Sequence, residues 1–118
     1  MPRLVTGENV YTGPVVILID ILSYSASEEF SSGMQAVGRA VIIGERSPGG
    51  ASAMNVSTLS NGAILGYPVA QLQEPDGTVV EGRGVIPDIT VTLERSQLLT
   101  GIDAQLQAAI QYIVEIVG

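Results

Sequence analysis

The sequence predicts an α/β fold with a βαβ unit, because two buried-strand patterns flank a helical pattern near the start of the chain. Residues 14–20 form a continuous apolar run rich in β-branched side chains, which is typical of a strand buried on both faces. Residues 40–45 form a second such run. The chain has 118 residues, 46% of them hydrophobic, which suits one domain with a modest core. We expect residues 14–118 to form that domain, or most of it, and residues 1–13 to flank it.

The helical segment between the two runs begins with a capping pattern. Ser25 and Glu28 are spaced as a capping box, in which the serine caps the first turn and the glutamate reaches back to it. The apolar residues that follow recur on one helix face, so we expect this stripe to pack on the core: Ala26, Phe30, Met34 and Val37.

The rest of the chain predicts β-hairpins and a C-terminal helix. Asn61-Gly62 is a strong turn signal between segments 56–59 and 63–65. A second turn at residues 74–77 separates segments 69–73 and 78–81, and a strand is expected at residues 89–93. A helix should begin near Asp103, with an apolar stripe of four residues: Leu106, Ile110, Ile113 and Val117.

Composition excludes several kinds of chemistry. Charged residues make up 14% of the chain, the net charge is −7, and the basic residues are single, scattered arginines, so nucleic-acid binding has no support. Cys is absent, which excludes disulfides, thiolate metal sites and a cysteine nucleophile. No metal or organic cofactor is indicated. The sequence shows neither a membrane-span pattern nor a signal-peptide pattern. Localisation stays open, an extracytoplasmic parent protein being one option.

The chain also lacks both His and Lys. Arginine stays protonated near neutral pH and cannot act as a base. A serine nucleophile in this chain would therefore need a base from another segment.

Low charge combined with several apolar strands predicts exposed apolar surface. We expect this surface to drive self-association, as a homodimer through sheet edges.

Three features are candidate site elements, each with a structural alternative. Ser25 lies where a strand turns into a helix, a place that exposes a hydroxyl beside free amides, but it also fits a plain helix cap. Glu81 could orient a catalytic imidazole or be an ordinary charge at a strand end. Gly49 and Gly50 could form a loop that a ligand approaches closely, or only a turn.

An ordered set of segments resembles the carboxyl-terminal processing peptidases, also called tail-specific proteases. Residues 14–20 and 23–28 (SYSASE) resemble the nucleophile region of that family, and residues 38–45 resemble the segment after its helix. Residues 75–77 and 80–89 (VEGRGVIPDI) resemble its closing motif. The resemblance covers about residues 14–115.

The resemblance implies a ClpP/crotonase-like fold and hydrolysis of peptide bonds through an acyl-enzyme. Ser25 matches the nucleophile, the amide of Ala26 matches an oxyanion donor, and Glu81 matches the acidic triad residue. Gly50 stands where one branch of the family has Lys. The loop at residues 44–51 looks more like the other branch, which includes the tricorn core protease and the interphotoreceptor retinoid-binding protein repeats. Catalytic members of that branch carry an upstream His.

The upstream His, the second oxyanion loop and the family's PDZ-like module have no counterpart in this chain. The resemblance therefore implies a serine endopeptidase in the full-length protein, with this chain inactive alone. Its partners would be an unstructured peptide or protein substrate and the missing N-terminal part. Tyr24 replaces a small residue and could alter access to Ser25. Because the branch includes lipid-binding relatives, a non-catalytic peptide- or lipid-binding module remains the alternative.

Overall fold

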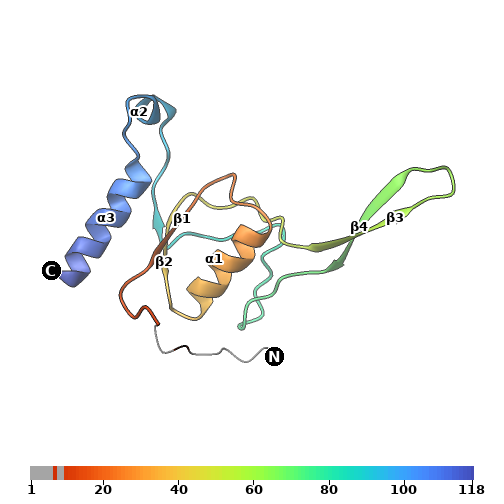
Figure 1. The fold of residues 1–118 in the computed structure, drawn as a ribbon, viewed down its shortest axis with the longest axis horizontal. Coiled ribbons are helices and arrows are strands. Elements are labelled where there is room, and N and C mark those ends of the chain that lie inside the picture. The colour runs from red at the N-terminus through yellow and green to blue at the C-terminus, as the bar shows by residue number, and fades with distance from the viewer. Residues whose placement is uncertain (1–6, 8–9) are drawn as a thin grey trace.

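A small parallel sheet forms the body of the molecule. The structure is a computed structural model that describes residue 7 and residues 10–118, so most of the predicted flanking segment lies outside the described residues. Strands β1 (Val16–Ile19), β2 (Val41–Gly44) and β5 (Ile89–Thr90) pair in the order β1-β2-β5, and both pairings are parallel (Figure 1). The predicted α/β class and βαβ unit are confirmed. The third strand is shorter than residues 89–93.

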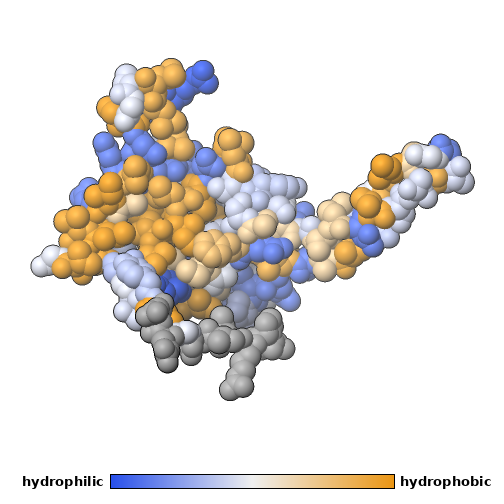
Figure 2. All heavy atoms as spheres, viewed as in Figure 1, coloured by the Kyte–Doolittle hydropathy of each residue, from blue (hydrophilic) through white to orange (hydrophobic). Residues whose placement is uncertain are grey.

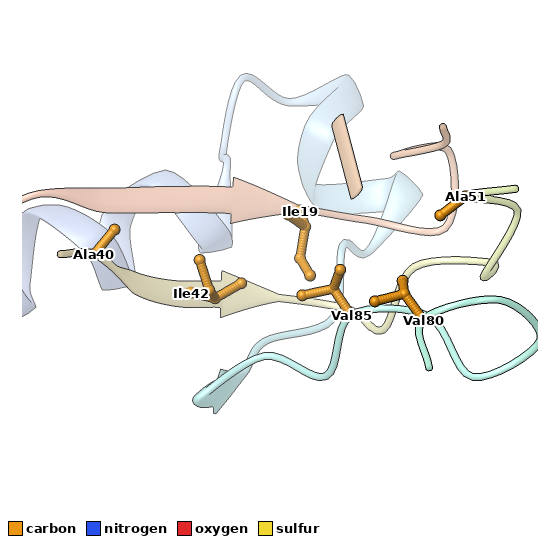
Figure 3. Close-up of a cluster of buried hydrophobic side chains, with 6 residues drawn as sticks. All are labelled: Ile19, Ala40, Ile42, Ala51, Val80 and Val85. Carbon is orange, nitrogen blue, oxygen red and sulfur yellow. The ribbon is translucent and has the colours of Figure 1, made fainter. Parts of the chain in front are cut away.

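The hydrophobic core lies beside the central strand. Ile42 is fully buried in β2, and Val80 and Val85 pack against it from the loop that precedes β5 (Figure 3). Ile19, Ala40 and Ala51 complete this cluster. The core is small and contains no large aromatic side chain, as expected for a modest domain.

Helix α1 (Ala26–Ala36) covers the sheet with a largely polar face, so the predicted apolar stripe is wrong except at Met34, which packs against the hydrophobic cluster. Its buried residues are Glu28, Ser31 and Ser32, whereas Phe30 and Val37 are 59% and 71% exposed. The apolar periodicity misled the prediction because hydrogen bonds of polar side chains, in addition to the Met34 contact, fix the helix orientation. The Ser32 hydroxyl, for example, donates to Glu74 Oε1 at 2.8 Å.

A long β-hairpin projects away from the body (Figure 1). Strands β3 (Ala53–Thr58) and β4 (Ile64–Ala70) are antiparallel and turn around Asn61-Gly62, so the first hairpin is confirmed with longer strands than expected. The second predicted hairpin is reduced to a turn with one bridge, between Gln73 and Val79.

Two helices end the chain. Helix α2 (Arg95–Leu99) was not predicted. Helix α3 (Ala104–Val117) begins where expected, since the Asp103 carboxylate accepts a hydrogen bond from the Leu106 amide at 2.9 Å. Figure 1 shows α1 and α3 on either side of the sheet. No helix among the described residues has the length and apolarity that crossing a membrane requires.

The predicted apolar stripe of α3 is also wrong for three of its members. Leu106, Ile110 and Val117 are between 48% and 64% exposed. The helix instead buries Gln105 and Ala109, and the Gln105 side-chain amide donates to the carbonyl of Val91 at 2.9 Å. Figure 2 shows the resulting apolar surface over α3 and the neighbouring body.

Candidate active site

Ser25 occupies a sharp turn between β1 and α1. Its backbone has φ 58° and ψ −120°, and it is the only residue other than glycine with positive φ in the described part of the chain. An ordinary N-cap is extended, as Asp103 is at φ −103° and ψ 100°. Holding a non-glycine residue in the disfavoured region costs about 1–3 kcal/mol, and such strain concentrates at functional sites. The Ser25 side chain is exposed, so the turn presents its hydroxyl to solvent.

The turn itself is fixed from both sides. On the strand side, the Asp20 carboxylate accepts from the Leu22 amide at 2.8 Å, and the Ser23 hydroxyl accepts from the Asp20 amide at 3.0 Å. On the helix side, the Ser27 hydroxyl donates to the Tyr24 carbonyl at 2.7 Å. The Asp20 carboxylate therefore serves as a hydrogen-bond acceptor inside the turn.

A buried carboxylate joins this turn to the glycine loop. Glu28 has no exposed surface, and each of its oxygens accepts two hydrogen bonds. Oε1 accepts from the Ser47 hydroxyl at 2.6 Å and the Gly49 amide at 2.7 Å. Oε2 accepts from the Gly50 amide at 2.9 Å and the Ser25 amide at 3.0 Å. Burial raises the pKa of Glu28, but these hydrogen bonds outweigh burial and hold the pKa below its ordinary value.

Gly49 and Gly50 therefore lie close to Ser25, and their amides donate to Glu28. They are not free to bind a ligand. The Tyr24 ring lies directly over Gly50, because a Cβ added at Gly50 would overlap the ring. Tyr24 thus fills the space beside Ser25 that a side chain at position 50 would occupy.

Glu81 lies on the other side of the same loop. Its carboxylate accepts from the Ser52 amide at 2.7 Å, and the side chain is exposed. It lines a hollow of about 530 Å³ at the base of the hairpin, whose other walls are Ser52, Met54, Pro68, Val69, Ala70 and Gln71. Glu81 and Ser25 are therefore linked through the loop at residues 49–52, and no direct contact joins them.

The amide of Ala26 is available for a ligand. It belongs to the first turn of α1, where amides lack helical partners, and it donates to no group among the described residues. No cluster of metal-ligating side chains occurs in the part of the chain that the structure describes. The site can therefore offer a hydroxyl, one free amide at a helix N-terminus, and the Glu81 carboxylate.

The profile of peptidase family S41 matches residues 3–91. The chain belongs to this family. A carboxy-terminal-processing protease of Bartonella bacilliformis is 34% identical over 93 residues, which cover 79% of this chain and 21% of that protein. The profile match contains the whole segment from Tyr24 to Glu81.

Comparison with solved structures also finds peptidases. The photosystem II D1 C-terminal processing protease is 32% identical, with a TM-score of 0.62, and the match covers 69% of this chain and 21% of that one. The tricorn protease is 27% identical, with a TM-score of 0.78, and the match covers 87% of this chain and 10% of that one. The expected family and ClpP/crotonase-like fold are thereby confirmed. This S41 chain spans about a fifth or less of these relatives.

Two features of this site were not predicted from the sequence. The capping box predicted the bond between Glu28 and the Ser25 amide, but not the three bonds from Glu28 to residues 47–50. The packing of Tyr24 on Gly50 was also missed. Both are contacts between distant segments, for which local spacing carries no signal.

Proposed function

We propose that this chain supplies the nucleophile portion of a serine endopeptidase whose full-length form hydrolyses peptide bonds through an acyl-enzyme. The observation that carries the proposal is the strained backbone of Ser25, at φ 58°, on a turn from strand to helix. Nucleophilic serines need such a turn because it exposes the hydroxyl beside free amides. Membership of peptidase family S41 supports the same reading.

In the proposed mechanism, Ser25 attacks the substrate carbonyl carbon while its hydroxyl proton passes to a His from the upstream part of the protein. Collapse of the tetrahedral intermediate breaks the C–N bond, and the same His gives the proton to the leaving amine. Water then hydrolyses the ester on Ser25 and restores the free hydroxyl.

Two other groups have roles in this mechanism. The free amide of Ala26 donates to the oxyanion, and the partial positive charge at the N-terminus of α1 adds to that stabilisation. Glu81 orients the imidazole, which would enter the hollow that the Glu81 carboxylate lines. Gly49 and Gly50 support the nucleophile turn through Glu28 and do not contact substrate.

The chain alone should be inactive, because it contains no His and no Lys. Its partners are then the N-terminal part of the same protein and an unstructured peptide or protein substrate. The substitution Ser25→Ala in the full-length protein tests the proposal, and we expect cleavage of an unstructured peptide to fall at least about 10³-fold. The free energy of unfolding should fall by no more than about 1 kcal/mol, because the Ser25 side chain contributes only its half of the capping box at the start of α1. Undiminished cleavage would refute the proposal.

A binding module of the same fold is the second candidate. The lack of a base in this chain and the Tyr24 ring beside Ser25 favour it. If the full-length protein binds an unstructured peptide or a fatty acid but cleaves no peptide, with either Ser or Ala at position 25, the binding function replaces the catalytic one.

A further inference from the structure

We propose that Glu28 is a positioning residue that holds the Ser25 turn in its reactive geometry by tying it to the glycine loop. This inference rests on the proposed function. It assigns to a buried helix residue a role in the reaction that differs from its role as a helix cap.

The hydrogen bonds to Glu28 use all the acceptor positions of its carboxylate. An ionised carboxylate is an acceptor only, with about four acceptor sites, and here four donors reach it at 2.6–3.0 Å. The Ser25 and Gly50 amides share one oxygen, so the nucleophile turn and the loop lie against the same atom. A shift of either segment would lengthen one of these charge-assisted bonds.

The carboxylate is in turn anchored to the core. The Ser47 hydroxyl that donates to Glu28 also accepts from the amide of Val85 at 2.7 Å. Val85 is fully buried in the hydrophobic cluster. A continuous chain of hydrogen bonds therefore runs from the core to the Ser25 backbone.

The bond to the Ser25 amide fixes the peptide plane between Tyr24 and Ser25. Without that bond, only the Ser25 carbonyl, its helix cap and the flanking turn would oppose relaxation of Ser25 from φ 58° toward the extended conformation of an ordinary N-cap. Such relaxation would move the hydroxyl, and a misplacement of about 1 Å can lower a rate about 100-fold. Helix α1 keeps other anchors, since Ser32 bonds Glu74 and Gln35 bonds Asp88.

The substitution Glu28→Gln in the full-length protein is the test. The amide side chain is isosteric, but its NH₂ group cannot accept, so two of the four donors lose their partner. We expect kcat for an unstructured peptide to fall about 10- to 100-fold, with KM within about 3-fold of wild type. The matched control is Ser32→Ala, which removes a buried hydrogen bond of the same helix far from Ser25 and should leave kcat within about 2-fold.

Amide resonances of the 118-residue chain give a readout independent of activity. In the wild type, the amides of Ser25, Gly49 and Gly50 should show couplings through the hydrogen bond to the Glu28 carboxylate carbon. This measurement tests the geometry even where Glu28→Gln does not fold, and absence of all three couplings would overturn the inference.

The outcomes separate this inference from the proposed function. If Ser25→Ala abolishes cleavage but Glu28→Gln keeps the wild-type kcat, the positioning role is wrong and the catalytic role of Ser25 stands. The same conclusion follows if Ser32→Ala lowers kcat as much as Glu28→Gln. If Ser25→Ala leaves cleavage intact, the proposed function itself fails.

Discussion

At Gly49 the backbone of another loop lies beside the Cα atom, whereas at Gly50 the neighbour is a side chain. A Cβ added at Gly49 would lie 2.6 Å from the amide nitrogen of Gly84, and Gly49 has φ +85°. A Cβ added at Gly50 would instead meet the Tyr24 ring, which is 59% exposed and free to swing outward. A side chain at position 49 is therefore opposed by main chain and by the backbone angle, whereas a side chain at position 50 is opposed only by the Tyr24 ring.

This contrast predicts unequal costs for two alanine substitutions. Gly49→Ala should lower the free energy of unfolding by more than about 2 kcal/mol, because it combines backbone strain with a clash against main chain. Gly50→Ala should cost less than about 1 kcal/mol, because the Tyr24 ring can move. Urea unfolding of the two variants measures the loss in free energy of unfolding for each, and equal losses would contradict the packing described around this loop.

At this scale the sequence predicts local contacts well and distant ones poorly. The spacing of Ser25 and Glu28 identified the helix start and one of the four hydrogen bonds to Glu28. The remaining three come from residues 47–50, and pairing across that separation depends on how β1 and β2 align. The backbone angle of Ser25, which departs from that of an ordinary cap, also cannot be predicted from a capping pattern.

Among the elements, β1, β2 and the first hairpin followed their sequence patterns, whereas the second hairpin and β5 are shorter than predicted. Helices α1 and α3 followed the sequence only in their boundaries, and α2 was not predicted. Runs of β-branched residues predicted both β1 and β2, but only β2 is central and buried on both faces. Strand β1 is an edge of the described sheet, and its Leu18 is 37% exposed. Apolar periodicity misplaced α1, since its serines and Glu28 are buried with hydrogen-bond partners. In the sequence, a buried polar face whose groups are hydrogen-bonded has the same residue pattern as a face exposed to solvent.

The docking of α1 through an ionised group predicts a pH dependence. The pKa of Glu28 is lower in the folded chain than its ordinary value of 4.5. Its stabilising contribution is therefore complete above about pH 4.5 and is lost as pH falls through that value toward the folded-state pKa. We expect the free energy of unfolding to decrease over this acidic range.

Urea unfolding at a series of pH values measures how the free energy of unfolding depends on pH. Glu28→Gln should reduce the fall in this free energy at acidic pH. Asp76→Asn is the comparison variant, because Asp76 is a fully exposed carboxylate whose pKa is lowered by backbone and side-chain hydrogen bonds from Thr78. An unchanged slope in Glu28→Gln would show that another group controls acid stability.

As a whole, the molecule is more open than its length requires. Its radius of gyration is 17.7 Å, against about 13–14 Å for a compact domain of this length. The projecting hairpin carries exposed Val56 and Ile64, and no charged residue occurs between Arg46 and Glu74. A two-stranded ribbon alone is only marginally stable in water, so the hairpin is suited to pairing with further strands.

We therefore predict that the isolated chain self-associates through the hairpin edges. Its sedimentation coefficient should rise with concentration, and Val56→Lys with Ile64→Lys should restore the monomer, because both side chains are at least 66% exposed and are not needed for the core. Ser96→Lys with Gln97→Lys, at two exposed positions of helix α2, is the charge-matched control. A wild-type chain that stays monomeric at high concentration would contradict this prediction.

The strained turn also has an evolutionary consequence. Glu28 holds position 25 by its backbone amide, so the fold depends on the side chain at this position only through a helix cap. Replacing Ser25 by Gly would relieve the strain at φ 58°, and such an exchange would be selected for stability once catalysis is no longer required. At position 25 a gain in stability and the retention of the hydroxyl are therefore alternatives, and only a requirement for the hydroxyl would keep serine there.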